Sequence, residues 1–235
     1  MAHRTTWTTT TPANPLVITT STTAGDTLVA YVVNDNSTVQ TYTWPSGFVE
    51  QFVSQTTTDG MNVACAIKKN ATGSEGALTI TPSGSTHIGG ISAYSGRDTT
   101  TQPDVTSVSV VENANENPPS TTGTIVPTTN GCDIVGIYGL DTSGTVNATT
   151  FSGGGLTWTT RADVNNGAFY NVSCGDAPQT TAASIGVTGT GTVNAAKVLF
   201  LIALRPAAGG GPTQDQIWPS IQQGILNPMI GRRYV

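Results

Sequence analysis

Short segments rich in Val, Ile, Leu and Thr recur along the first 208 residues, separated by turns that contain Gly, Asn and Pro. β-Branched residues favour the half-buried surface of a strand, whereas Gly, Asn and Pro favour turns. No helical period of apolar residues precedes the C-terminal segment. The pattern predicts strands over residues 16–20, 27–34, 39–43, 48–54, 62–68, 77–81, 87–94, 105–111, 123–126, 133–140, 146–151, 157–164, 168–174, 184–187 and 196–204. Many short, closely spaced strands indicate an all-β fold, an antiparallel, jelly-roll-like β-sandwich.

The strand pattern is repeated within the chain. AGDTLVAYVV in the first half has a counterpart in NGCDIVGIYG, and DGMNVACAI has one in GAFYNVSC, which predicts two sequence-related halves over residues 24–96 and 130–206. Two arrangements fit the repeat: two small sandwiches in tandem, or one large sandwich whose two sheets are built from related halves. The connection over residues 102–127 contains strand-like segments, whereas a linker between domains is more uniformly polar, so the single sandwich is favoured.

The ends of the chain differ from this body. Residues 1–15 are predicted to form an extended N-terminal arm, residues 16–207 the sandwich, and residues 208–235 a tail that begins at a glycine hinge. The first 208 residues hold 42 of the 43 threonines. The tail is instead rich in large apolar and cationic side chains, and it is too short to form a core of its own.

Side chains of the kind that dominate protein interfaces are concentrated in this tail. We therefore predict that it docks on another surface through Ile217, Trp218, Ile221, Ile225, Leu226, Met229, Ile230, Arg232, Arg233 and Tyr234. Trp7, in the threonine-rich arm, has no obvious neighbour in its own chain and is predicted to be a second, weaker anchor.

Composition excludes several partners. Only 10% of residues are charged, the net charge is −5 and the isoelectric point is about 4.7, which argues against a phosphate-binding surface and hence against nucleic acid. No apolar run is long enough to span a bilayer, and none at the N-terminus has the length of a signal peptide. We expect synthesis in the cytoplasm and no membrane partner.

The cysteines do not suggest a disulfide framework or a metal site. Cys65, Cys132 and Cys174 are odd in number and lack CxxC spacing, so we predict that all three are small buried hydrophobic residues. Asp26 and Asp133 occupy equivalent places in the two halves and are predicted to be strand-entry residues rather than calcium ligands. No cofactor and no metal are predicted.

The candidates for catalysis are few. His3 lies in the predicted arm, and His87 begins a strand, where we expect a surface histidine. A triad of His87 with Ser85 or Ser92 and Asp98 lacks the strand-turn-helix context of a nucleophile elbow. The sequence therefore predicts no enzyme.

Two tryptophans belong to the repeated turn regions of the body. Trp44 and Trp158 could stack on sugars, but we expect them to close the ends of the sandwich.

Several short motifs together resemble a known family. They are Gly25-Asp26-Thr27-Leu28-Val29, Trp44-Pro45-Ser46-Gly47-Phe48, Ile91-Ser92-Ala93-Tyr94-Ser95-Gly96 with Asp98 and Pro103-Asp104, Thr159-Thr160-Arg161-Ala162-Asp163, and Leu201-Ile202-Ala203-Leu204-Arg205-Pro206-Ala207. The pattern is similar to β-sandwich modules of tailed-bacteriophage virion proteins and bacterial surface proteins, and it covers about residues 16–207. The chain departs from it at Phe48, where the family has Trp, and in the second half, where residues 152–156 read SGGGL without Pro.

The resemblance implies a non-catalytic module displayed on a particle or cell surface. The expected function is that of a virion structural protein, a capsid decoration (cement) protein mounted on the major capsid protein through its terminal arms and located on the capsid exterior. Sister copies are expected partners in a homo-oligomer, by analogy a trimer. The alternative is a tail-associated receptor- or carbohydrate-binding module.

Overall fold

The computed structural model describes residues 3–56, 60–105, 108–116, 118–141, 148–167, 169–192 and 195–208. These residues form an all-β, antiparallel structure. The strands of the first half are β1 (His3–Ala13), β2 (Leu16–Thr19), β3 (Thr27–Asp35), β4 (Tyr42–Thr43), β5 (Phe48–Gln55), β6 (Met61–Lys68), β7 (Ala77–Pro82) and β8 (His87–Tyr94). Those of the second half are β9 (Val108–Glu116), β10 (Ser120–Ile125), β11 (Asp133–Asp141), β12 (Thr150–Ser152), β13 (Thr159–Asn165), β14 (Tyr170–Pro178), β15 (Ile185–Thr190) and β16 (Ala195–Leu204).

The first half is a jelly roll. Its five-stranded sheet has the order β1-β8-β3-β6-β5, and its three-stranded sheet has the order β2-β7-β4. The pairs β1·β8, β2·β7 and β3·β6 are nested, as they are when one long hairpin wraps into two sheets. The jelly-roll-like sandwich predicted from the strand pattern is confirmed.

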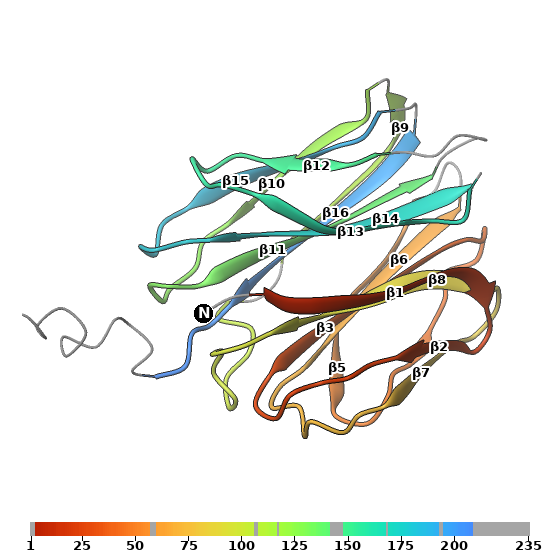
Figure 1. Ribbon diagram of the computed structural model, residues 1–235. Helices are drawn as coiled ribbons and strands as arrows, with labels where there is room; N and C mark the ends of the chain where they lie inside the picture. The colour runs from red at the N-terminus through yellow and green to blue at the C-terminus, as the bar shows by residue number, and fades with distance from the viewer. Residues whose placement is uncertain are drawn as a thin grey trace, which may run out of the picture.

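The second half repeats this strand order. Its five-stranded sheet runs β9-β16-β11-β14-β13, and its three-stranded sheet runs β10-β15-β12. Both halves also have a register shift at the same place: one extra residue precedes the pair Phe52–Cys65 in the first half and Ala162–Cys174 in the second. Neither predicted arrangement describes the result fully, because the five-stranded sheets of the two halves face each other and each half adds an outer three-stranded sheet (Figure 1).

The largest core cluster fills the space between the two five-stranded sheets. Phe52 and Phe200 stack across it with ring centroids 4.7 Å apart. Because Gly139 has no side chain, Val63 can fill the space beside it. The strands at the centre of each inner sheet, β3 and β11, are buried along nearly their whole length, because an outer sheet covers their other face. This explains why they read as continuous apolar runs, whereas β7, β10 and β15 alternate.

The N-terminal segment does not form an arm outside the sandwich over residues 3–13. These residues form β1, which pairs with β8 at the edge of the first sheet. Trp7 lies opposite Ile91 and packs against the core of the first half, so the expectation that it has no neighbour in its own chain is wrong. Threonine-rich sequence suits an edge strand because it has strong β-propensity without needing burial on both faces.

Candidate functional site

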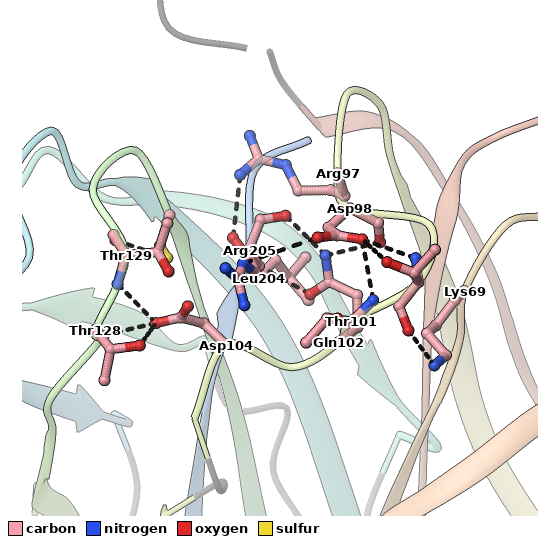
Figure 2. Close-up of polar contacts among 12 residues, drawn as sticks. Lys69, Arg97, Asp98, Thr101, Gln102, Asp104, Thr128, Thr129, Leu204 and Arg205 are labelled. Carbon is pink, nitrogen blue, oxygen red and sulfur yellow. Dashed lines mark hydrogen bonds and ion pairs between the residues drawn. The ribbon is translucent and has the colours of Figure 1, made fainter. Parts of the chain in front are cut away.

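The chain crosses from the first half to the second at one end of the molecule, in a polar cluster that we call the junction. It consists of residues 96–104, 128–133 and 203–207, and Figure 2 shows part of it, together with Lys69. The backbone of the crossing segment pairs with the end of β16: the Asp98 amide donates to the Arg205 carbonyl (2.9 Å), and the Asp104 amide to the Ala203 carbonyl (2.8 Å). The Ala207 amide in turn donates to the Gly96 carbonyl at 3.1 Å. The last described residues of the chain are therefore tied to the connection between the halves.

Arg97 is the buried centre of the junction. Its guanidinium lies 2.8 Å from the Asp133 carboxylate, and Nη1 donates to the carbonyls of Gly131 (3.2 Å) and Leu204 (3.1 Å). The side chain of Arg97 is 1% exposed and that of Asp133 is 9% exposed. Burial raises the pKa of Asp133 to about 6, although the charge of Arg97 opposes the shift. A buried cation with three partners fixes the junction in one geometry.

Gln102 binds one residue of the outgoing chain at two points. Its Oε1 accepts from the Arg205 amide (2.9 Å), and its Nε2 donates to the Arg205 carbonyl (2.7 Å), so the side chain acts like a neighbouring strand. Asp98 orders the turn that precedes Gln102. Its carboxylate accepts hydrogen bonds from the hydroxyl and the amide of Thr100 and from the amide of Thr101. These bonds lower the pKa of Asp98 to about 2, so the carboxylate stays ionised.

Asp104 ties the crossing segment to the loop before β11. Its Oδ2 accepts from the amides of Thr128 (2.6 Å) and Thr129 (3.0 Å). Burial acts to raise the pKa of Asp104, but the hydrogen bonds from Thr129 and Thr128 outweigh it, and the pKa is lowered. Lys69 contributes a bond from the first half, from Nζ to the Thr100 carbonyl at 2.6 Å.

Both ends of the described chain lie at the junction. His3 pairs with Tyr94, three residues before Arg97, and its ring contacts the Tyr94 ring edge-on at 5.6 Å. Arg97 in turn forms a β-bridge with Pro206. Figure 1 shows the N-terminus and the blue end of the chain on this same side. The segments before residue 3 and after residue 208 therefore both connect to the same end of the body.

The ten predicted docking residues, from Ile217 to Tyr234, lie outside the described residues. Of the predicted anchors, only Trp7 belongs to the described part, on the edge strand β1. The residues that position the start of the tail, Arg97 and Gln102, were not predicted as functional. One feature of the sequence could have indicated a functional role for Arg97. Arg97 and Asp98 are adjacent charged residues that closely follow an apolar strand, in a body that has few charges.

The histidines do not form a catalytic triad. His87 donates from Nδ1 to the Ser85 carbonyl (2.8 Å), so in the neutral ring Nε2 accepts from the Tyr42 hydroxyl (3.0 Å), while Asp98 is bonded to its own turn. The prediction of a surface histidine was wrong: His87 is 1% exposed, and burial lowers its pKa to about 4. The ring of Tyr42 covers the imidazole edge-on at 5.3 Å, a contact that no local pattern predicts.

Several other sequence predictions have definite outcomes. All three cysteines are free and buried, as predicted. Asp26 directly precedes β3 and Asp133 begins β11, as expected of strand-entry residues. Their places in the two halves differ by one residue, because the strand register matches Asp133 with Thr27. Asp26 pairs with Arg4 at 3.0 Å. Trp44 and Trp158 each pack, partly buried, against the core of their own half.

Neither a metal site nor a membrane-spanning helix is found among the residues that the structure describes. No group of three or more His, Cys, Asp or Glu side chains there is arranged to hold a metal ion. The same residues contain no helix with the length and apolar character needed to cross a bilayer.

Comparison of the chain with protein-family models, with curated proteins and with solved structures finds no match. The class that the structure defines is an all-β, antiparallel β-sandwich.

Proposed function

We propose that this chain is a non-enzymatic structural protein of a virion, most simply a capsid decoration (cement) protein. In this proposal the sandwich stands on the capsid exterior. The tail after residue 208 attaches it to the major capsid protein, and sister copies of the chain are further neighbours, in a homo-oligomer such as a trimer.

The observation that carries the proposal is the common exit of the chain ends. His3 and Ala207 are both tied to residues 94–97, so a tail that docks on a shell would hold the body by one end. The opposite end and both outer sheets would then face away from the shell. A binding segment that left from the middle of a sheet face would instead lay the body flat and cover that face.

The outer sheet of the second half suits exposure to solvent. On the sheet β10-β15-β12, every outward position is Thr, Ser or Gly, and Thr122 and Thr188 share a hydroxyl–hydroxyl bond of 2.7 Å across the strands. A face without charge or large apolar groups offers few of the side chains that anchor protein interfaces. The tail, with Trp218, Arg232 and Tyr234, carries the side chains that such anchors require.

Deleting residues 209–235 tests the proposal. We expect the truncated protein to keep the fold and the unfolding midpoint of the full chain, because residues 3–208 contain the four sheets and the three core clusters, and to lose incorporation into particles. The measurement is occupancy on purified capsids by quantitative electrophoresis, with the thermal midpoint as the control for folding. Full occupancy of the truncated protein would refute docking by the tail.

A graded variant sharpens the same experiment. Trp218→Ala with Ile221→Ala should reduce occupancy, whereas Gln222→Ala with Gln223→Ala, in the same segment, should not.

The number of copies per particle distinguishes a location on the capsid shell from one on the tail of the virion. Hundreds of copies per particle fit decoration of the shell, whereas a few to tens would favour the tail-associated receptor- or carbohydrate-binding module. Glycan binding that is lost on replacing Trp44 or Trp158 would also favour that module.

A further inference from the structure

The contact between the two halves is reciprocal. The strands β1 to β8 correspond in order to β9 to β16. β1 packs against β13, which is the counterpart of β5, and β5 packs against β9, which is the counterpart of β1. These two contacts are one contact with the roles exchanged, as in an isologous, twofold interface. The match is approximate, because β8 approaches β13 and β14 more closely than β16 approaches their counterparts, β5 and β6.

The centre of the interface obeys the same rule. β3 packs against β11, its own counterpart. β3 also contacts β14 while β11 contacts β6, and β14 and β6 are counterparts. These exchanges require an approximate twofold axis that passes between β3 and β11, parallel to them.

The junction lies on this axis. Tyr94 is paired with the first residue of β3, and Leu204 is paired with the first residue of β11, so residues 94 and 204 are equivalent. Gly96 then corresponds to Pro206, and Arg97 corresponds to Ala207. The twofold rotation therefore exchanges the hydrogen-bonded pair Ala207 and Gly96 with the bridged pair Arg97 and Pro206. Equivalent segments touch each other in this way where a twofold axis passes between them.

The surfaces that meet are alike in part of their composition, although Phe52 and Phe200 correspond to the smaller Ala162 and Gly90. Equivalent residues of the two halves, defined by the strand register, contribute to one core cluster: Val29 and Val135, Val63 and Val172, Cys65 and Cys174. The backbone pairing of each five-stranded sheet stays within its half, and each half has a second core cluster of its own beneath its outer sheet. The two halves are thus joined through the inner faces of their five-stranded sheets, and these two faces are related to each other.

We propose that this five-stranded face is self-complementary, so that each half can recognise a second copy of itself through the surface that now joins the two halves. The chain is then a covalent pseudo-dimer of jelly rolls, and the connection between β8 and β9 adds effective concentration but is not needed for recognition. This inference does not depend on the proposed function, because it concerns contacts inside the body.

The experiment starts from the full chain. A protease site inserted between Val105 and Val108 allows native protein to be cut into its two halves. We expect the cut protein to keep the mass of the intact chain in native mass spectrometry. The control is the same site inserted at residues 57–59, between two strands of one jelly roll, where cutting should also leave one particle.

Self-recognition is then measured by exchange. The cut protein is unfolded in urea, a twofold excess of tagged first half is added, and the mixture is diluted to refold. We expect first-half dimers, of twice the fragment mass, beside the mixed complex. If only the mixed complex forms and the excess first half stays monomeric or unfolded, the face is not self-complementary and the proposal is overturned.

A pair of variants identifies the surface used. Val63→Asp, in the face between the halves, should abolish the first-half dimer, whereas Val17→Asp, on the outer sheet where Val17 is 48% exposed, should leave it unchanged. Dimers that survive Val63→Asp would use a different surface and would overturn the proposal. Folding of the variant fragments is monitored by circular dichroism, so that loss of dimer with retained strand signal is the supporting result.

Discussion

Replacing Arg97 by Met should destabilise the body strongly, because it removes the cation that forms an ion pair with the buried carboxylate of Asp133. The substitution leaves Asp133 without its partner at 2.8 Å and leaves the Gly131 and Leu204 carbonyls without their donor. Removing one partner of a buried ion pair typically costs about 3–5 kcal/mol. We expect a loss of that size in the free energy of unfolding at pH 8, measured by urea titration of the full chain.

A double-mutant cycle separates the charge from the packing. Asp133→Asn keeps an oxygen acceptor for Arg97 and should cost less than Arg97→Met. The double variant Arg97→Met with Asp133→Asn should be more stable than the sum of the single losses predicts, by roughly 1–3 kcal/mol, because no buried charge remains unpaired.

The pH dependence supplies a second check on the same variant. Burial already raises the pKa of Asp133 to about 6, and the loss of Arg97 removes the influence that opposes this shift. A group whose pKa is higher in the folded state destabilises the fold as the pH rises through that pKa. The defect of Arg97→Met should therefore be smaller at pH 5 than at pH 8. A loss below 1 kcal/mol at pH 8, or additive single effects, would refute the assignment of Arg97 as the centre of the junction.

Two other predictions test the buried histidine and the packing between the halves. Because the pKa of His87 is about 4 in the folded chain and its ordinary value is 6.5, the unfolded chain binds the proton first, and this group should lower the free energy of unfolding by roughly 3 kcal/mol between pH 7 and pH 4. His87→Phe should lack this contribution in urea titrations, and an unchanged slope with pH would contradict it. Gly139→Ala should cost roughly 1–3 kcal/mol, since a Cβ there would lie 2.4 Å from Val63 Cγ2. Gly186→Ala, which meets no atom within 4 Å, should stay within about 0.5 kcal/mol, and equal effects would argue against close packing between the sheets.

The strand pattern alone predicted the fold class because the apolar and polar periods of this chain are clear. β7 and β10 alternate strictly, and β3 and β11 are continuous apolar runs, so the strands could be located from local sequence. The number of layers could not be predicted, since a buried run does not tell whether its second face meets an outer sheet or another half.

The position of β1 could not be predicted for a related reason. TTWTTTT has β-propensity, but nothing local shows that β8 has an open edge to receive it. His87 was placed wrongly because its burial depends on Tyr42, 45 residues away in the sequence. The junction depends on contacts at longer range still, such as that between Gln102 and Arg205, separated by 103 positions. Contacts of this kind follow from topology and not from local pattern.

The edges of the inner sheets bear on how this protein can meet a partner. The four edge strands of the two five-stranded sheets, β1, β5, β9 and β13, each have a register shift against their neighbour. Such irregularities twist an edge and discourage the addition of a further strand. The flat faces of these sheets are already occupied by each other. Two common routes to association, edge pairing and face packing, are thus restricted for the inner sheets. The outer sheets and the segments outside the sheets remain as means of attachment, and the deletion of residues 209–235 tests the second of these for the proposed function.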